Sequence, residues 1–366
     1  MRTIACLILL CFTCFGTLPL HAQEMRWRNP MDGNARAIQG QLPIASLERS
    51  YYRLPDDMEQ LVRPPVWNLS RQNAGVYIEF TTDASAITVR YQVSEALDMP
   101  HMPATGVSGV DLYAKHKNGG WDWAAGSYQF GDTITYRFAN LAIGNEEKMR
   151  LYLPLYNSVT WMEIGVSADA AFEFVPATVD RPVIVYGTSI AQGACASRPG
   201  LAWTSILARQ LDLPMVNLGF SGNGRLEKPL IDLIATVDAH LFVLDCMPNL
   251  TPGSVPDPEI LDRIEYAVTH LKEKHPDTPI LLVEHSGGGS SQVIDTARSA
   301  NYRHTSELMR SAYQKLVSQG VNRLYLLTTE AIGMGTESTV DGVHPNDIGM
   351  MQHATAYREI INTILK

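Results

Sequence analysis

The stretch Val183-Ile184-Val185-Tyr186-Gly187-Thr188-Ser189-Ile190 decides the fold expected for the second half of the chain. It opens with a short apolar, largely β-branched run, which is typical of a buried strand. Gly187 permits a sharp turn after this strand and leaves Ser189 at the carboxyl end of a sheet, where open α/β folds bind their ligands. We therefore expect Ser189 to be a nucleophile, although an ordinary turn or a helix N-cap is the commoner role of such a serine when the stretch is taken alone.

Strand and helix patterns alternate from this stretch to the end of the chain. Five short apolar strands with helices between them predict an α/β fold with a flavodoxin-like, doubly wound parallel sheet. The strands are expected at about 182–186, 215–218, 241–245, 280–284 and 324–327. The helices are expected at about 202–210, 226–236, 256–274, 305–318 and 347–365.

The first half of the chain has a different pattern. Residues 24 to about 178 contain short β-rich segments, partly alternating between apolar and polar residues and separated by glycine and asparagine turns. Such segments without helical periodicity predict an antiparallel β-sandwich or jelly roll. The boundary falls near 174–178, so we expect a β-domain over 23–178 and an α/β domain over 179–366. The strands of the β-domain are expected at 76–80, 87–93, 110–113, 133–138 and 149–153.

The N-terminus has the pattern of a secretory signal peptide over residues 1–22. Arg2 precedes an apolar run over 4–15, and Leu20-His21-Ala22 offers a small-residue cleavage site. The run is well short of the roughly 20 apolar residues of a spanning helix, which disfavours a membrane anchor. We therefore expect a secreted or periplasmic protein, with no membrane insertion after cleavage. The mature chain keeps Cys195 and Cys246, which could pair or remain buried free thiols.

Composition and charge are those of a soluble globular protein. Of 366 residues, 45% are hydrophobic and 18% are charged, and the formal net charge is -9. Nucleic acids and anionic membrane surfaces require a concentrated basic patch, and the sequence has no Lys/Arg cluster, so we expect neither partner. The histidines lack metal-site spacings such as His-Glu-x-x-His, so we expect no metal and no other cofactor. Nothing in the sequence indicates the oligomeric state.

Polar side chains follow most of the expected parallel strands. Ser189 follows the first, a glycine-dense turn over 217–224 follows the second, and Asn249 follows the third. The backbone N–H groups of such a turn could face an anion. Beyond the fifth strand, Asp341 precedes His344 by three residues, a spacing at which the carboxylate can reach back to the ring and fix its tautomer. A nucleophilic serine needs such a base, and the base needs such a carboxylate.

Taken together, these residues resemble the SGNH (GDSL-type) hydrolases, which are serine esterases built on a flavodoxin-like sheet. Gly187-Thr188-Ser189, the turn at Gly222, Asn249 and Asp341-x-x-His344-Pro345 match the four blocks of that family in order. The chain is similar in particular to a bacterial subgroup whose N-terminal β-domain carries a Gly-x-Asp-Leu-Tyr motif, here residues 109–113. The resemblance spans nearly the whole mature chain.

The resemblance implies a role for each of these side chains. Ser189 would attack an ester carbonyl, His344 would take the serine proton, and Asp341 would stabilise the imidazolium. The oxyanion hole would consist of the N–H groups of Ser189 and Gly222 and the side-chain amide of Asn249.

Two positions depart from the family pattern. Thr188 stands where the family usually has an aspartate, and Met247-Pro248 precede Asn249 in place of the usual Gly-x-Asn-Asp form. Thr188 is outside the proton relay, so its departure bears on substrate details more than on activity.

Other residues are candidates for substrate contact. Trp121 and Trp123 flank an aspartate beside a glycine turn and could form a stacking platform for a sugar, or simply pack in a loop or domain interface. Glu284 and His285 end the fourth strand, where substrate contact and a structural role are equally compatible with the sequence. The run 287–291 lacks the lysine of a phosphate loop and is expected to be a mobile loop near the site.

These features predict a secreted serine esterase that acts on an acylated small molecule or polysaccharide. Acetyl groups on carbohydrate are the favoured substrate, by resemblance to carbohydrate esterases of similar domain layout. One alternative is a lipase or thioesterase that acts on longer acyl chains. The other is a carbohydrate-binding protein without activity, which the complete set of relay residues disfavours.

Overall fold

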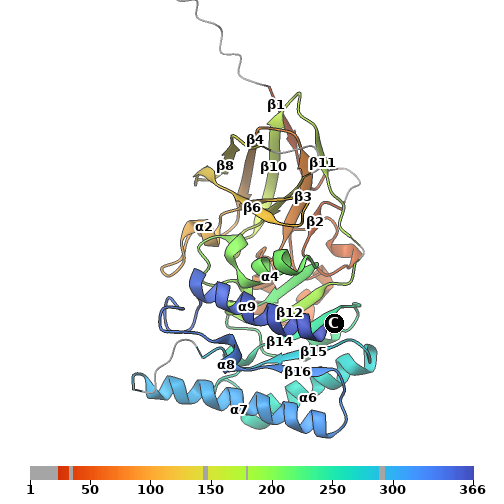
Figure 1. The fold of residues 1–366 in the computed structure, drawn as a ribbon, viewed down its shortest axis with the longest axis vertical. Coiled ribbons are helices and arrows are strands. Elements are labelled where there is room, and N and C mark those ends of the chain that lie inside the picture. The colour runs from red at the N-terminus through yellow and green to blue at the C-terminus, as the bar shows by residue number, and fades with distance from the viewer. Residues whose placement is uncertain (1–23, 33–35, 143–146, 179, 288–292) are drawn as a thin grey trace, which may run out of the picture.

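Two parts with different kinds of sheet follow one another along the chain (Figure 1). The computed structural model describes residues 24–32, 36–142, 147–178, 180–287 and 293–366. The expected signal peptide over 1–22 and all of the 287–291 run except Gly287 lie outside the described residues. Among the helices of the described ranges, none combines the length and the hydropathy that a bilayer crossing demands.

The N-terminal part is a β-sandwich of two antiparallel sheets, which confirms the predicted class. Alternate side chains of its strands point inward, as Ile87, Val89 and Tyr91 do in β4, where all three are fully buried. The first sheet has the order β1 (Met25–Arg28), β10 (Val159–Ser167), β4 (Ala86–Val93), β8 (Ile134–Ala139), β7 (Gly126–Gln129). The second has the order β11 (Phe172–Phe174), β3 (Tyr77–Thr82), β9 (Lys148–Tyr152), β5 (Asp111–Lys115), β6 (Trp121–Ala124), and β2 (Ile38–Gln39) pairs with β3.

The C-terminal part contains the predicted parallel sheet. Its strand order places the first strand between the second and third, which is the flavodoxin-like arrangement. The order is β13 (Met215–Gly219), β12 (Val183–Gly187), β14 (Leu241–Asp245), β15 (Ile280–Val283), β16 (Leu324–Leu327). The helices are α3 (Ser189–Gln192), α4 (Trp203–Leu211), α5 (Lys228–Ile234), α6 (Asp257–Lys274), α7 (Thr296–Ser318), α8 (Thr329–Ile332) and α9 (Asp347–Ile364), with the 3₁₀ turns η3 (Pro199–Leu201) and η4 (Met247–Asn249).

Helices cover both faces of this sheet, which explains its uninterrupted apolar strands. Ile184 and Tyr186 of β12 pack into a core with α5, α6 and α7, whereas Val183 and Val185 pack into a second core with α4 and α9. The longest helix, α7, begins at Thr296 instead of near 305, because the Asp295 side chain caps it by accepting the N–H of Arg298. Its first turns are polar, so the apolar pattern alone did not reveal them.

Most apolar side chains of a segment of the N-terminal part, residues 42–70, pack on the α/β sheet, whereas Tyr51 is buried in the core of the sandwich. The segment forms two 3₁₀ helices, η1 (Ala45–Leu47) and η2 (Asp56–Gln60), and the helix α1 (Pro64–Ser70). The fully buried Leu42 and Val66 share one core with Phe220 of the C-terminal part. The predicted boundary near 178 therefore divides the β-sandwich from the parallel sheet. Side chains from both sides of this boundary nevertheless share one apolar core.

The motif at 109–113 joins the two parts. Asp111 is buried, and its carboxylate accepts Nη1 of Arg198 at 2.5 Å, the N–H of Gly200 at 2.9 Å and Nε1 of Trp123 at 2.5 Å. Burial raises the pKa of Asp111, and Arg198 opposes that rise. A buried carboxylate without such a partner is costly, so the motif acts as a connection between the β-sandwich and the loop after α3.

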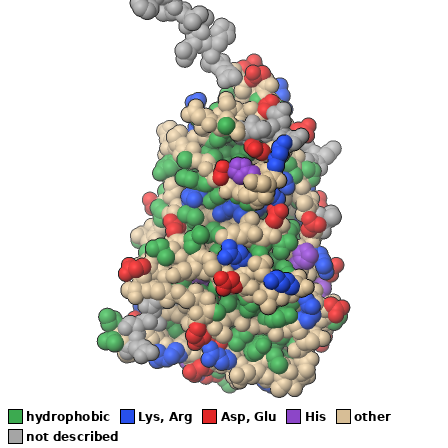
Figure 2. Space-filling view, viewed as in Figure 1, with side chains coloured by type: hydrophobic (Ala, Val, Ile, Leu, Met, Phe, Trp, Pro, Cys, Tyr) green, Lys and Arg blue, Asp and Glu red, His purple; other side chains and the backbone are tan. Residues whose placement is uncertain are grey.

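Charged side chains of both signs are interspersed on the face seen in Figure 2. Cys195 and Cys246 are buried free thiols, which resolves the choice that the sequence left open. Burial raises the pKa of Cys195 to about 12, with a smaller contribution from Asp341. Such a thiol is protonated and unreactive at neutral pH.

Candidate active site

Ser189 lies where β12 gives way to a helix. β12 ends at Gly187 and α3 begins at Ser189, with Thr188 as N-cap, whose Oγ1 accepts the N–H of Ile190 at 3.3 Å. A side chain at position 187 would not fit, because its Cβ would lie 2.5 Å from Cβ of Ala191. The glycine thus lets the helix start directly after the strand, and this turn places Ser189 at the carboxyl edge of the sheet.

The three residues expected to form a proton relay lie within hydrogen-bond distance of one another. Oγ of Ser189 is 2.9 Å from Nε2 of His344, and Nδ1 of the same ring is 2.7 Å from Oδ2 of Asp341. Ser189 is nearly buried, whereas His344 and Asp341 are partly exposed in the loop that leads into α9. A proton on Nδ1 leaves Nε2 free to accept the serine hydroxyl, which is the tautomer that a general base requires.

The loop around Asp341 fixes this tautomer. Oδ1 of Asp341 accepts the N–H of Val343 at 3.0 Å and of His344 at 2.8 Å, so the carboxylate folds back onto its own loop. Burial raises the pKa of Asp341, but hydrogen bonds from the backbone and ring of His344 outweigh it and keep the pKa below its usual value. The carboxylate is therefore ionised at neutral pH and holds the Nδ1 proton of the ring. Nη1 of Arg298 donates to the carbonyl of Asp341 at 3.2 Å and anchors the loop to α7.

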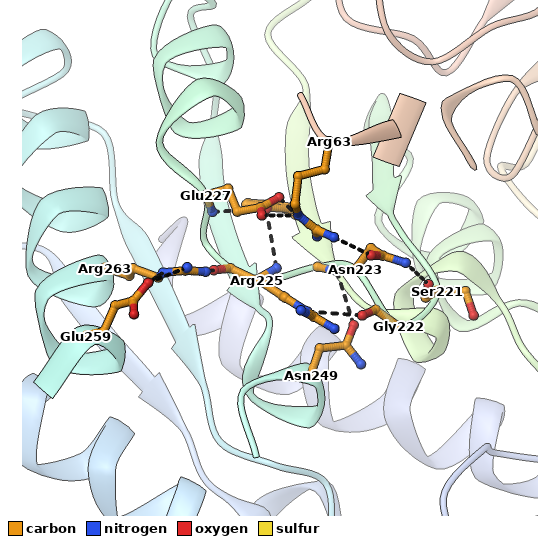
Figure 3. A network of polar contacts seen from close by, with 11 residues as sticks. Arg63, Ser221, Gly222, Asn223, Arg225, Glu227, Asn249, Glu259 and Arg263 are labelled. Carbon is orange, nitrogen blue, oxygen red and sulfur yellow. Dashed lines mark hydrogen bonds and ion pairs between the residues drawn. The ribbon is translucent and has the colours of Figure 1, made fainter. Parts of the chain in front are cut away.

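The loop after β13, residues 220–224, forms the opposite side of the site. Gly222 has a φ of +69°, and its Cβ would meet no atom within 4 Å, so this peptide faces open space. Gly224 lies so close to the serine turn that its Cβ would be 1.9 Å from the carbonyl oxygen of Gly187. Oδ1 of Asn249 accepts the N–H of Gly224 at 3.1 Å, which turns Nδ2 of the same amide away from the loop backbone (Figure 3). The amide donor of Asn249 is therefore held in one orientation.

Two buried glutamines support this loop from behind, and sequence reasoning missed them. Oε1 of Gln192 accepts the N–H of Ser221 at 3.0 Å, and Nε2 of Gln192 donates to Oε1 of Gln72 at 2.6 Å. Gln72 in turn donates to Glu95 at 2.9 Å. Gln192 lies on α3, three residues after Ser189, so the helix that carries the serine also positions the loop.

A fully buried arginine from the N-terminal part adds to this support. Nη1 of Arg53 donates to the carbonyl of Gly219 at 2.6 Å and to that of Asn217 at 3.3 Å, and its guanidinium lies 5.0 Å from the ring centre of Phe220. Burial lowers the pKa of Arg53 to about 9, and it is still mostly protonated at neutral pH. No signal in the sequence connects residue 53 with residue 219, because only the folded chain brings them together.

The β-sandwich also contributes one side chain to the site. The ring centre of His101 lies 5.9 Å from that of His344, and the two rings are inclined by 38°. His101 is exposed, but Met102 beside it is buried in the core of the C-terminal part. Three residues after Met102, Thr105 in the short helix α2 (Ala104–Val107) donates its hydroxyl to the carbonyl of Ser197 at 2.7 Å. In the sequence His101 is a lone histidine in a loop, so no motif pointed to it.

Glu284 is not available to a substrate, which corrects its candidacy as a contact residue. Its side chain is 0% exposed, and its carboxylate is bound by Nε of Arg310 at 2.8 Å and by the N–H of Thr329 at 3.0 Å. Glu284 therefore joins β15, α7 and α8, and has the structural role that the sequence left open.

His285 is also enclosed. Its ring stacks on Tyr302 with centres 3.8 Å apart, and Nδ1 accepts the N–H of Gly287 at 3.0 Å. Burial, with a smaller effect from His353, lowers the pKa of His285 to about 3, so the ring is neutral at physiological pH. With 1% of its surface exposed, His285 supports the loop and cannot contact a substrate in this conformation.

The two tryptophans lie in β6, the edge strand of the second sheet. Trp121 packs with a cluster of three buried tyrosines, and the guanidinium of Arg150 lies 4.5 Å from the centre of one of its rings. Trp123 is 48% exposed, but the guanidinium of Arg198 lies 4.2 Å from its ring and its Nε1 is bound to Asp111. Their described contacts are with the interface and not with Ser189 or His344. These contacts agree with the packing interpretation, and sugar stacking on the exposed part of Trp123 stays a prediction.

Within the described part of the chain, no group of three or more His, Cys, Asp or Glu side chains is arranged to hold a metal ion. The arrangement at Ser189 consists of a hydroxyl, a base, an orienting carboxylate and fixed N–H donors. These are the parts needed for acyl transfer through a serine.

Comparison with known proteins agrees with this geometry. The model of the GDSL-like lipase/acylhydrolase family matches residues 180–362, and the model of the N-terminus of the SGNH-hydrolase-type esterases (GxDLY) matches residues 25–172. The chain therefore belongs to the GDSL-like lipase/acylhydrolase family, in its form with an N-terminal β-domain. The resemblance inferred from the sequence blocks is confirmed.

Solved structures share the complete architecture. A putative GDSL-like lipase from Bacteroides ovatus is 32% identical, with a TM-score of 0.82 over 93% of this chain and 98% of that one. The salicylyl acyltransferase SsfX3 from a tetracycline biosynthetic pathway is 21% identical, with a TM-score of 0.73 over 93% and 97% of the two chains. A family two carbohydrate esterase from Cellvibrio japonicus is 14% identical, with a TM-score of 0.56 over 93% and 98%. The last two show the fold alone.

One curated protein also matches a short region. Beta-glucosidase 21 of Oryza sativa subsp. japonica is 34% identical over 86 residues, which make up 22% of this chain and 16% of that protein. The match thus covers about a sixth of the length of that relative.

Proposed function

We propose that the chain is an exported serine esterase that removes O-acyl groups, and acetyl groups in particular, from carbohydrate. The observation that carries the proposal is the unbroken relay from Ser189 Oγ through His344 to Asp341, with contacts of 2.9 and 2.7 Å. Family membership supports an esterase. The choice of acetylated sugar rests on the expected export and on the occurrence of carbohydrate esterases among proteins of this fold.

The geometry supports a two-step acyl transfer. In the first step, Oγ of Ser189 bonds to the ester carbonyl carbon while Nε2 of His344 takes the hydroxyl proton, and Asp341 stabilises the imidazolium. The carbonyl oxygen becomes an oxyanion that accepts the N–H groups of Ser189 and Gly222 and Nδ2 of Asn249. His344 then returns its proton to the departing sugar oxygen as the carbon–oxygen bond breaks. In the second step, water attacks the acyl-serine by the same route and releases the carboxylic acid.

Replacement of the nucleophile tests this function. Ser189→Ala should lower acetate release from acetylated oligosaccharides by at least about 10⁴-fold, because the attacking oxygen is lost. Ser318→Ala, at the exposed end of α7, is the matched control and should keep the wild-type rate. Circular dichroism should show both variants folded. Wild-type rates for Ser189→Ala would refute the proposal.

A preference for longer acyl chains is the alternative within the same chemistry. Val340 is 49% exposed and its N–H donates to the carbonyl of His344 at 2.9 Å, so the loop that carries the proposed base also presents an exposed apolar residue. Rates on 4-nitrophenyl acetate and 4-nitrophenyl octanoate separate the two substrate classes. An acetyl esterase should prefer the acetate, whereas a lipase should prefer the octanoate.

Export is tested separately. Sequencing of the N-terminus of protein recovered from the periplasm or medium should begin near Gln23 if the first 22 residues are removed as proposed. Recovery of the intact N-terminus inside the cell would contradict this part of the proposal.

A further inference from the structure

Three arginines surround the loop that carries Gly222, and they differ in how their charges are paired (Figure 3). Arg63 forms an ion pair with Glu227, with Nε 2.5 Å from Oε1 and Nη2 3.3 Å from Oε2. Arg263 pairs with Glu259, at 3.2 Å for Nε and 2.6 Å for Nη2. Arg225 makes no ion pair within the described ranges. Its described side-chain hydrogen bond is from Nε to the carbonyl of Gly222 at 3.2 Å.

The position of Arg225 is fixed by the groups around its backbone. Its N–H points to the hydroxyl of Tyr186 at 3.4 Å, and Tyr186 is fully buried. Its carbonyl accepts Nη1 of Arg263 at 2.8 Å. Both neighbouring contacts come from well-packed elements, β12 and α6. The Arg225 side chain points back toward Gly222 and Asn249, so its guanidinium lies on the rim of the proposed oxyanion hole (Figure 3).

The bond at Nε leaves the two terminal nitrogens of Arg225 as donors. A guanidinium presents such nitrogens in a planar fork that matches a carboxylate. The protein as a whole has a formal charge of -9, which repels anions at long range. A guanidinium that has no ion-pair partner among the described residues and lies beside Gly222 is therefore a local site at which an anion can bind despite the net charge.

We propose that Arg225 binds a carboxylate on the ester substrate and so directs the enzyme toward anionic esters. This inference rests on the proposed esterase function and adds a substrate class to it. The carboxylate could belong to the alcohol, as in an acetylated uronic acid, or to the acyl group, as in a hemisuccinate ester. The shared chemistry is a carboxylate near the scissile ester, and the assay separates its two sources.

Matched pairs of esters measure this preference. The first pair is the acetate ester of methyl glucuronide and that of methyl glucoside, which differ only in a carboxylate or hydroxymethyl group at C6. The second pair is 4-nitrophenyl hemisuccinate and 4-nitrophenyl acetate. For at least one pair, the wild-type ratio of kcat/KM, anionic over neutral, should fall about tenfold in Arg225→Gln, because the charge-assisted hydrogen bonds are lost. The pair that responds identifies where the carboxylate lies.

Two further variants separate charge from structure. Arg225→Lys keeps the charge without the fork and should restore part of the ratio. Lys228→Gln removes a positive charge three residues away whose partner is Asp232, and should leave the ratio as in the wild type. Added salt should reduce the wild-type ratio, since the group is partly exposed.

Each outcome has a definite meaning. An equal loss on anionic and neutral esters in Arg225→Gln would mean that Arg225 only supports the Gly222 loop, and would overturn the inference. An unchanged ratio for both pairs would overturn it as well. If the wild type released acetate from neither sugar and hydrolysed neither nitrophenyl ester, the esterase function itself would fail, which is a distinguishable result.

Discussion

The two loops that complete the candidate site are held in place in different ways. The histidine loop, residues 339–346, is tied mostly to itself: Asp341 accepts two N–H groups from within the loop, and the N–H of Val340 donates to the carbonyl of His344. The oxyanion loop, residues 220–224, is tied to distant parts of the chain. Gln192 holds the N–H of Ser221 at 3.0 Å, and Nη1 of Arg63 holds Oδ1 of Asn223 at 2.9 Å.

One loop is therefore shaped by residues that are neighbours in the sequence, and the other by residues that are distant in the sequence. A loop that binds itself can be recognised from a short sequence motif, because the residues that shape it are its own. A loop held by Gln192 of α3 and by Arg63, the N-cap residue of α1, depends on the docking of the N-terminal segment 42–70 against the α/β sheet. We expect a substitution in the histidine loop to change the structure of that loop alone. A substitution in the oxyanion loop should also affect its contacts with residues far away in the sequence.

The largest expected effect comes from the histidine loop. In Asp341→Asn, the oxygen can still accept the N–H groups of Val343 and His344, but the amide nitrogen would donate to Nδ1 and force the proton onto Nε2. His344 then cannot accept the serine proton, and kcat should fall by about 10⁴-fold. Because the loop keeps its own hydrogen bonds, the thermal midpoint should move little. A kcat within tenfold of the wild type would contradict the assigned role.

The next effect tests the oxyanion loop at its donor. Asn249→Ala should lower kcat by about 10²–10³-fold, because the charge that develops on the carbonyl oxygen loses one fixed donor. Asn249→Asp keeps the oxygen that binds the N–H of Gly224 but replaces the donor with an acceptor. It should be at least as inactive. If Asn249→Asp were active, Asn249 would serve only to position the loop.

Asp245, the last residue of β14, sharpens the comparison because its pKa shift is opposite to that of Asp341 in the histidine loop. Burial raises the pKa of Asp245 to about 7, against a hydrogen bond of 3.0 Å from the hydroxyl of Tyr357. The folded protein therefore keeps a proton that the unfolded chain releases near pH 4, so the free energy of unfolding falls as pH rises from about 4 to about 7. Asp245→Asn should lessen this fall by roughly 2–4 kcal/mol. Urea unfolding at pH 4.5 and 8 measures it, and an identical fall in both proteins would contradict the shift.

The smallest expected effect concerns the support of the oxyanion loop. Gln192→Leu removes the acceptor of the Ser221 N–H and should lower kcat by about tenfold, because the oxyanion loop is then less well positioned for the transition state. KM should change little, because the groups that contact the bound substrate remain. Thr82→Val is a control in the β-sandwich: it also removes a buried hydrogen bond, from Oγ1 to the carbonyl of Ala171. It should reduce stability and leave kcat unchanged. A loss of kcat in both variants would indicate a general effect of instability.

The same contrast explains which features could be predicted. The parallel sheet follows from five uninterrupted apolar strands, and Ser189, Asp341 and His344 follow from spacing and strand ends. The positions of Glu284 and His285 next to the expected fourth strand left substrate contact and a structural role equally open, and burial just after β15 favours the structural role for both. The start of α7 was placed too late because polar helical turns carry no apolar period.

Sequence by itself determined the sheet order expected of this class, the chemical groups at the strand ends and the membership of the family. These depend on local periodicity and on short motifs, which are properties of neighbouring residues. Only the tertiary structure decided that most apolar side chains of residues 42–70 pack in the α/β core, that Arg53 and Gln72 support the oxyanion loop, and that His101 lies near His344. The physical reason is that such contacts join groups more than 100 residues apart. They form only when burial of the two apolar cores brings the sandwich and the sheet together.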